Sequence, residues 1–175
     1  MNTNRKFTWV LFLSVTVIFV FFGTLVVNNI LKFDKIWKQS KNNKIVITAK
    51  NQKVLNLKTN NNEYINLSEK NKFIHYWATW CKPCVRELKQ FDSLLLNKRN
   101  YSFYFISDEE KDVVQKFLKK NNFTNVPFYL VNPKDNVFEV DIYPTTFYKK
   151  NKDSLFTRIV GVQDWTPFFE EKKKE

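Results

Sequence analysis

The residues of this chain most suited to chemistry are its only two cysteines, Cys81 and Cys84, which stand three positions apart. An apolar and aromatic run at residues 73–78 precedes them and a helical pattern follows, so we expect the pair where a strand leads into a helix. A helix N-terminus has unpaired backbone N–H groups and a partial positive charge, which stabilise the reactive thiolate. Lys82 adds a positive charge, and Pro83, at the expected first helical position, lacks an N–H that would be unpaired there anyway. The pattern predicts a redox-active dithiol.

Two other uses of the cysteine pair fit the sequence less well. A disulfide between residues three apart closes a loop too small to constrain much of the unfolded chain, which argues against a purely structural bridge. A metal site would have at most three soft ligands, the two cysteines and His75, the only histidine. We therefore expect no metal and no cofactor.

The elements that must position this dithiol follow from hydrophobic periodicity. Val85, Leu88, Phe91 and Leu95 recur at spacings of three and four, which predicts a helix over residues 83–97. The other expected elements are a strand at 73–78, a strand at 101–106, a helix capped by Ser107 and ending near residue 120, a strand at 126–131, a short helix or turn at 132–141, hairpin strands at 145–149 and 155–160, and a short helix after Asp164. Strands that alternate with helices and end in a hairpin imply an α/β sandwich with a mixed sheet.

Before residue 73 the pattern is weaker. Two short β-like runs at residues 45–47 and 54–57 are separated by polar turns. Residues 28–44 form a polar linker rich in lysine and asparagine, and residues 172–175 form a charged tail.

The N-terminal segment predicts a membrane anchor. Residues 7–27 are uncharged and mostly apolar, and as a helix they would extend about 32 Å, enough to cross a bilayer core. A cleaved signal peptide is the alternative, but the run is long for one, and no Ala-x-Ala-like cleavage site follows it. We expect a retained single-pass signal-anchor preceded by a short tail at residues 1–6.

The charge of the chain does not indicate nucleic-acid binding. The net charge is +12, and half of it lies in residues 1–44. The remainder of the chain mixes basic and acidic residues, with no Lys/Arg stripe and no recognisable nucleic-acid motif.

Taken together, these features resemble the thioredoxin superfamily, and more narrowly the membrane-anchored TlpA/ResA-type thiol–disulfide oxidoreductases of bacteria. The similarity covers about residues 45–171. It is carried by YWATWCKPC at residues 76–84, by Glu87 three residues later, by YPTTF at residues 143–147, which matches the segment with the superfamily's cis-proline, and by Gly161. The resemblance implies a thioredoxin-like three-layer sandwich with a central mixed sheet.

The resemblance also implies roles for the site residues. Cys81, at the outer end of the motif where the helix field and solvent reach it, is the expected nucleophile, and Cys84 is the expected resolving thiol. The pair would alternate between a dithiol and a redox-active Cys81–Cys84 disulfide. Pro144, in cis after Tyr143, would place its backbone beside Cys81, exclude metal and pair with an incoming substrate strand. Trp80 is expected to shield and position the dithiol, and a role as a core aromatic is the alternative, which is compatible with the first.

Two titratable residues complete the expected site. Glu87 lies one helical turn beyond Cys84 and would accept or donate a proton during exchange, or raise the thiol pKa by repulsion. The alternative is a solvated helix glutamate. His75 departs from thioredoxins, which place a buried acid six residues before the first cysteine. It is either a proton relay or a core histidine satisfied by one hydrogen bond.

These features predict an enzyme on the periplasmic side of a bacterial cell membrane that reduces disulfides in selected protein substrates. The resemblance implies a membrane or extracytoplasmic thiol as electron donor, and a role in cytochrome c maturation or thiol maintenance. Lysines after the span favour the opposite orientation, but long domains translocate largely regardless of charge.

Alternatives to this function stay open. A disulfide-forming oxidase is one, because Lys82 favours the thiolate while Glu87 opposes it. A non-catalytic, membrane-bound binding module is another. A peroxiredoxin-like peroxidase fits poorly, because the Pro-x-x-x-Thr-x-x-Cys pattern is missing before Cys81.

Overall fold

A computed structural model describes residues 23–24, 27, 42–95, 101–153 and 155–169. The expected membrane span at residues 7–27 lies almost entirely outside these residues, as do the tails at 1–6 and 172–175 and most of the expected linker. Among the described residues, no helix is both long and apolar enough to cross a membrane.

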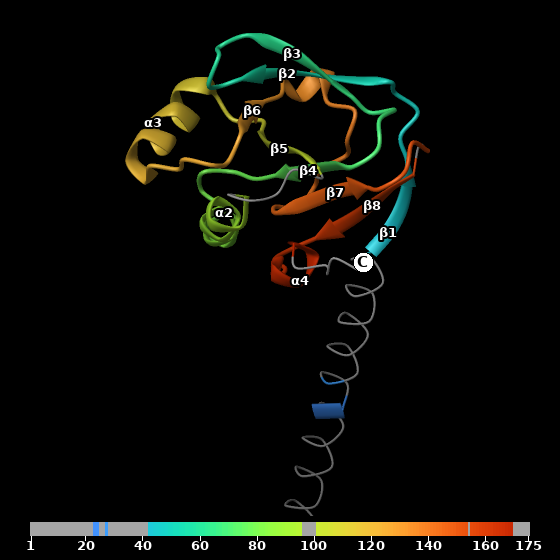
Figure 1. Ribbon diagram of the computed structural model, residues 1–175. Helices are drawn as coiled ribbons and strands as arrows, with labels where there is room; N and C mark the ends of the chain where they lie inside the picture. Colours follow the sequence, from blue (N-terminus) through green and yellow to red (C-terminus); the bar gives the residue numbers. More distant parts are fainter. Residues whose placement is uncertain (1–22, 25–26, 28–41, 96–100, 154, 170–175) are drawn as a thin grey trace, which may run out of the picture. The chain divides into compact units, whose positions relative to one another are not determined.

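A mixed eight-stranded sheet is the centre of the described domain (Figure 1). The strands lie in the order β1-β8-β7-β4-β5-β6-β2-β3. The pairs β4–β5 and β5–β6 are parallel, and the other neighbours are antiparallel, which confirms the expected α/β fold with a central mixed sheet. The strands are β1 (Asn42–Val46), β2 (Asn51–Asn56), β3 (Asn62–Asn66), β4 (Lys72–Tyr76), β5 (Ser102–Ser107), β6 (Phe128–Leu130), β7 (Thr145–Lys149) and β8 (Leu155–Val160).

The order of elements from β4 onward is the one that the periodicity predicted. The helices are α2 (Lys82–Leu94), α3 (Lys111–Asn121), α4 (Thr166–Phe169) and the 3₁₀ helix η2 (Pro133–Asp135). Both hairpin strands have the predicted bounds, whereas α2 begins one residue earlier and ends three residues earlier than expected.

Strand β3 is an element that the sequence did not reveal. Its only fully buried apolar side chain is Ile65, and Tyr64 is 68 % exposed. It forms by antiparallel pairing with β2, so its position depends on a partner strand and not on its own hydrophobic pattern. Strand β1 likewise pairs with β8 and begins at Asn42, inside the expected linker.

The two faces of the sheet are covered differently. Alternate residues of a strand point to opposite faces, and Phe73 of β4 packs in one core cluster with residues of α2, α3 and α4. Ile74 and Tyr76 point into a second cluster, where Val131, Phe138 and their neighbours cover the sheet. Within the described residues, the third layer is therefore the segment with η2 and not a longer helix.

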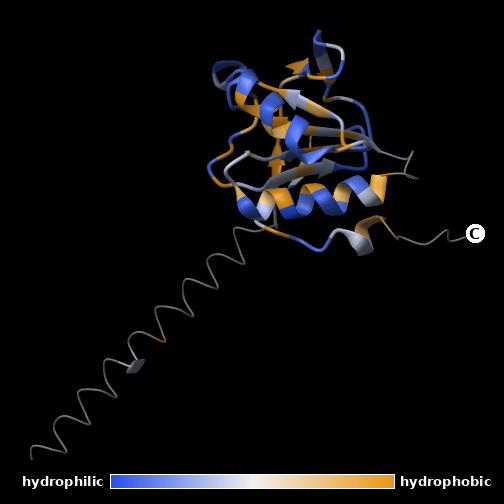
Figure 2. Ribbon diagram, turned by 90° about the vertical axis from the view of Figure 1, so that its left-hand side faces the viewer, coloured by the Kyte–Doolittle hydropathy of each residue, from blue (hydrophilic) through white to orange (hydrophobic). Residues whose placement is uncertain are grey.

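Helix α2 lies against the sheet through one apolar side. Its buried residues, Cys84, Glu87, Leu88 and Phe91, recur at helical spacing, and Figure 2 shows hydrophobic and hydrophilic residues interspersed along it. Pro83 is its second residue and not its first as expected, which costs no hydrogen bond because the first four N–H groups of a helix have no partner within it.

The start of α3 differs from the prediction. Glu110 is the residue before the helix, and its side chain makes no capping hydrogen bond. Ser107 ends β5, and its hydroxyl bonds Glu109 instead of the helix. The predicted cap was wrong because three residues separate Ser107 from the first turn, too many for a capping side chain.

Candidate active site

The two cysteines form a disulfide at the N-terminus of α2. Their Cα atoms are 5.3 Å apart, and Cys81 is the residue that caps the helix. The Cys84 backbone N–H donates to Cys81 Sγ at 3.2 Å, so the helix end is directed at this sulfur, as the position of the motif predicted. Cys81 is 4 % exposed and Cys84 is fully buried. Solvent therefore reaches Cys81 much less than expected, although it is the more accessible of the two.

Next to the disulfide lies a pair of aromatic residues, the exposed Trp80 and the half-buried Tyr143. Trp80 is 67 % exposed, which is inconsistent with a core role. Its ring meets that of Tyr143 edge to face, with centroids 5.6 Å apart. Burial and a hydrogen bond to Asp108 raise the pKa of Tyr143 well above its usual range. Lys82 is exposed on the first turn of α2.

The loop before β7 contains the cis peptide bond that the resemblance implied. The Tyr143–Pro144 peptide bond is cis. The Pro144 carbonyl accepts a hydrogen bond from the Gly161 N–H at 2.8 Å. Gly161 has a φ of 80°, a conformation that costs little only for glycine, and this bond ties the cis-proline loop to the end of β8.

Glu87 is buried in α2 and faces the segment after β8. Its Oε1 atom accepts hydrogen bonds from the Gln163 N–H and the Trp165 Nε1–H, both at 2.8 Å. Only 2 % of the residue is exposed, so it is not a solvated helix glutamate. Burial raises the pKa of Glu87 to about 7, although both hydrogen bonds act to lower it. The carboxyl group therefore changes its protonation near neutral pH.

His75 lies at the other oxygen of this carboxyl group. Its Nε2 atom is 3.9 Å from Glu87 Oε2, and neither atom has a hydrogen-bond partner among the described residues. Its Nδ1 atom is 2.9 Å from Thr146 Oγ1. Burial lowers the pKa of His75 to about 3, so the ring is neutral and the contact with Glu87 is not an ion pair at neutral pH.

The active-site segment is held by a second glutamate that sequence reasoning missed. Glu109 Oε2 accepts from the Thr79 N–H at 2.6 Å, and its Oε1 accepts from the Thr79 hydroxyl at 2.7 Å. The Ser107 hydroxyl adds a third bond at 3.2 Å. Nothing in the spacing of these residues predicts the contact, because Glu109 and Thr79 are thirty positions apart. Thr146, Gln163 and Trp165 were missed for the same reason.

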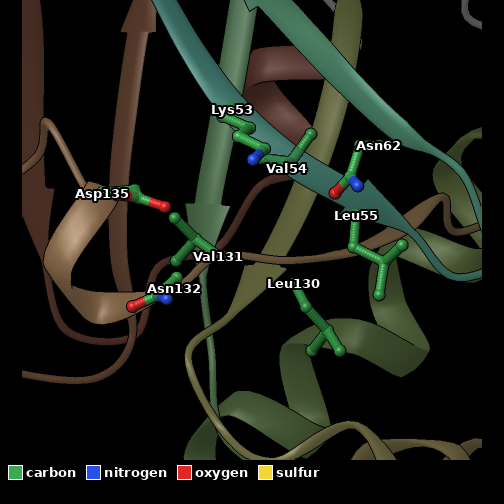
Figure 3. Close-up of a pocket in the computed structure, with 8 residues that line it drawn as sticks. All are labelled: Lys53, Val54, Leu55, Asn62, Leu130, Val131, Asn132 and Asp135. Carbon is green, nitrogen blue, oxygen red and sulfur yellow. The ribbon is translucent and has the colours of Figure 1, made fainter.

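The structure thus assembles the expected residues in two groups around the disulfide. Trp80 and Tyr143 meet outside it, and His75 and Glu87 meet inside the fold. A separate pocket of about 270 Å³ is lined by residues of β2, β3, β6 and the segment that follows β6, among them Lys53 and Asp135 (Figure 3). It contains no residue of the motif, so we assign it no part in the site.

Comparisons with known proteins agree with this geometry. The model of the AhpC/TSA family matches residues 45–140, more than half of the chain. Sporulation thiol-disulfide oxidoreductase A of Bacillus subtilis is 28% identical over 126 residues, which cover 63% of this chain and 76% of that protein. Thiol-disulfide oxidoreductase ResA of Bacillus cereus is 26% identical over 122 residues, covering 66% and 69%.

A solved structure shows the same fold. The exposed lipoprotein thioredoxin of Streptococcus pneumoniae superposes with a TM-score of 0.57 at 16% identity, covering 65% of this chain and 91% of that one. The names of the relatives bear out the expectation of an oxidoreductase enzyme. With its thioredoxin-like fold and its matched residues, the chain belongs to the AhpC/TSA family.

Proposed function

We propose that this protein is an extracytoplasmic, membrane-tethered thiol–disulfide oxidoreductase that reduces disulfides in selected protein substrates. The observation that carries the proposal is the Cys81–Cys84 disulfide at the N-terminus of α2, with the buried carboxyl group of Glu87 one helical turn away. The first feature supports electron transfer by thiol exchange, and the second supports a proton acceptor that serves it.

In the first step, the Cys81 thiolate of the reduced protein attacks one sulfur of a substrate disulfide. A mixed disulfide forms between Cys81 and the substrate, and the other substrate sulfur leaves as a thiolate that takes a proton from solvent. The partial positive charge of the helix end stabilises the Cys81 thiolate before the attack.

In the second step, the Cys84 thiol loses its proton to Glu87 and attacks Cys81 Sγ. The Cys81–Cys84 disulfide forms, and the second substrate sulfur leaves as a thiolate. Two electrons have passed to the substrate, and a thiol donor must return them. A carboxyl group with a pKa of about 7 suits this proton transfer, because it is a stronger base than an ordinary glutamate and is still partly ionised at neutral pH.

The substrate would bind over the aromatic pair of Trp80 and Tyr143. Trp80 contacts Tyr143, which precedes the cis-proline in the loop before β7. We propose that an extended segment of the substrate pairs with the backbone of the loop at Tyr143–Pro144, which places its disulfide near Cys81.

The location rests on the sequence. The uncharged stretch at residues 7–27 supports a membrane anchor, and we place the domain on the periplasmic side. A membrane or extracytoplasmic thiol would be the electron donor, and the physiological role would be cytochrome c maturation or thiol maintenance. A C-terminal reporter fusion that is active only in the cytoplasm would overturn this placement.

Substrate trapping tests the proposed function. A Cys84→Ser variant cannot resolve the mixed disulfide, so it should accumulate covalent complexes with partner proteins that dissociate on addition of a reductant. Cys81→Ser is the matched control and should trap nothing. Because the chain has only these two cysteines, no other thiol contributes to the background. Absence of trapped partners would favour the non-catalytic binding module.

A redox titration tests the direction of electron flow. We expect a reduction potential below about −200 mV for a reductase, whereas a value well above it would assign the protein as a thiol oxidase.

A further inference from the structure

The side chains of His75 and Glu87 face each other through the one polar side-chain atom in each that has no hydrogen-bond partner among the described residues. Glu87 Oε1 already accepts two hydrogen bonds, and His75 Nδ1 already contacts Thr146. The remaining atoms, Glu87 Oε2 and His75 Nε2, face each other at 3.9 Å and have no hydrogen-bond partner among the residues that the structure describes. Buried polar atoms are rarely left in this way, so the pair requires an explanation.

The His75 ring is held in place from three sides. Phe91 of α2 and Phe105 of β5 pack against it, with ring centroids 5.0 and 5.4 Å away. Thr146 of the neighbouring strand β7 binds its Nδ1 edge. The ring cannot turn away from Glu87 without losing these contacts. A displacement of about 1 Å in the carboxyl group would bring Oε2 within hydrogen-bond distance of Nε2.

A neutral imidazole can pair with either state of a carboxyl group. With hydrogen on Nε2, it donates to the Glu87 carboxylate, and Nδ1 accepts from the Thr146 hydroxyl. With hydrogen on Nδ1, it donates to Thr146, and Nε2 accepts from the protonated carboxyl group. The Thr146 hydroxyl serves both arrangements because it donates or accepts by rotation. No charge forms on the ring in either case.

We propose that His75 is a positioning residue that stabilises both protonation states of Glu87 by exchanging its neutral tautomers. The role of this exchange in catalysis rests on the proposed function, because it keeps the carboxyl group in one place while a proton arrives from Cys84 and leaves again. His75 is then neither a proton relay that becomes charged nor a histidine with a purely structural role.

Few other charged groups act on this pair. Arg86, next to Glu87 in α2, is exposed and slightly favours the carboxylate. The other groups that contact the pair are neutral: Gln163 and Trp165 from the segment after β8, Thr146 from β7, and the rings of Phe91 and Phe105.

Nuclear magnetic resonance of the full-length oxidised protein tests the proposal directly. His75 is the only histidine, so its two ring nitrogens give one unambiguous set of ¹⁵N signals. We expect a neutral ring throughout, with the proton moving from Nδ1 to Nε2 as the pH rises through the titration of Glu87 near 7. A single tautomer across this range, or a ring that becomes charged there, would overturn the proposal.

Two substitutions at His75 distinguish the role of Nε2 from that of Nδ1. Asparagine places an amide near the Nδ1 position, where it can still bond Thr146, whereas glutamine reaches the Nε2 position and can donate or accept there. We expect His75→Asn to raise the ¹³C-detected titration midpoint of Glu87 by about one unit, because a buried carboxylate loses its donor. His75→Gln should keep the midpoint close to that of the unchanged protein. Equal midpoints in both variants would refute a role for Nε2.

A control accounts for general loss of stability. Tyr76→Phe removes a hydrogen bond to Asn136 on the opposite face of the sheet, and the midpoint of Glu87 should not move. None of these measurements depends on turnover. If trapping and turnover fail while the tautomers still exchange, the proposed function is wrong and this inference holds. If turnover is normal while His75 stays in a single tautomer, the proposed function holds and this inference is wrong.

Discussion

Two glutamates near the dithiol have opposite surroundings. Both oxygens of Glu109 accept hydrogen bonds, two from Thr79 and one from Ser107, and the side chain is half-buried. Glu87 is almost fully buried, and only one of its oxygens is bonded, while the other faces the neutral ring of His75. Both carboxyl groups lie close to the active-site segment, because Glu109 binds Thr79 and Glu87 follows Cys84 by three positions in α2. Their chemistry nevertheless differs.

Burial and hydrogen bonding can give two identical side chains different roles. A carboxylate whose two oxygens both accept hydrogen bonds acts as an anchor for the groups that donate to it. A buried carboxyl group with one unsatisfied oxygen is less stable as an anion and takes up a proton near neutral pH. We therefore assign Glu109 to positioning Thr79 and Glu87 to proton transfer.

Substitution of each glutamate by glutamine should separate the two roles most strongly. Glu87→Gln should slow the resolution of the mixed disulfide by about 100- to 1000-fold, because an amide cannot accept the Cys84 proton. Glu109→Gln should slow it by less than about threefold, because an amide still accepts from the Thr79 N–H and can donate to its hydroxyl. Stopped-flow kinetics with a preformed mixed disulfide measures this step directly.

The fold should tolerate Glu87→Gln. The amide oxygen can still accept from Gln163 and Trp165, and the amide nitrogen can donate to His75 Nε2. Circular dichroism and thermal unfolding of the variant check this point. Equal rates for the two glutamine variants would remove the distinction between the two carboxyl groups.

The second effect is on the pH dependence of stability. Glu87 has a folded pKa of about 7 against the usual 4.5, so the folded state holds a proton that the unfolded state releases, and stability falls as pH rises between these values. His75 has a folded pKa of about 3 against 6.5, so its contribution rises with pH between these values. The two slopes oppose each other between pH 4.5 and 6.5.

Removing Glu87 or His75 should reveal the pH dependence of stability that the other residue causes. Relative to the unchanged protein, the stability of Glu87→Gln should rise with pH between 4.5 and 6.5, and that of His75→Asn should fall, by up to about 3 kcal/mol each. Urea unfolding with the disulfide intact measures these free energies. Parallel stability curves for all three proteins would contradict the assigned pKa shifts.

Those elements of the domain whose residue pattern lies within one short segment could be predicted from the sequence. The periodicity of Val85, Leu88 and Phe91 predicts α2, and two strand-like runs on either side of the polar residues 151–154 predict the β7–β8 hairpin. The pair Cys81 and Cys84 identifies the chemistry. Strand β3 could not be predicted, because its position depends on pairing with β2.

The site could be predicted only in part for a related reason. Glu87 follows from its spacing to Cys84 along one helix, and local sequence contains that information. The contacts of Glu87 with Trp165 and of Glu109 with Thr79 join segments 78 and 30 positions apart. Such contacts result from how the sheet and helices pack, which no short pattern encodes. The burial that sets the pKa of Glu87 has the same origin.

The smallest effect concerns Glu109 as an anchor. Glu109→Ala removes all the acceptors for Thr79, and a half-buried N–H and hydroxyl left unbonded should cost about 1–2 kcal/mol in the free energy of unfolding. Glu109→Gln should recover most of this loss, which urea unfolding of the two variants can resolve. If Glu109→Gln were as unstable as Glu109→Ala, the negative charge itself would be required. The contrast between the two glutamates would then lie in burial alone and not in how their oxygens are bonded.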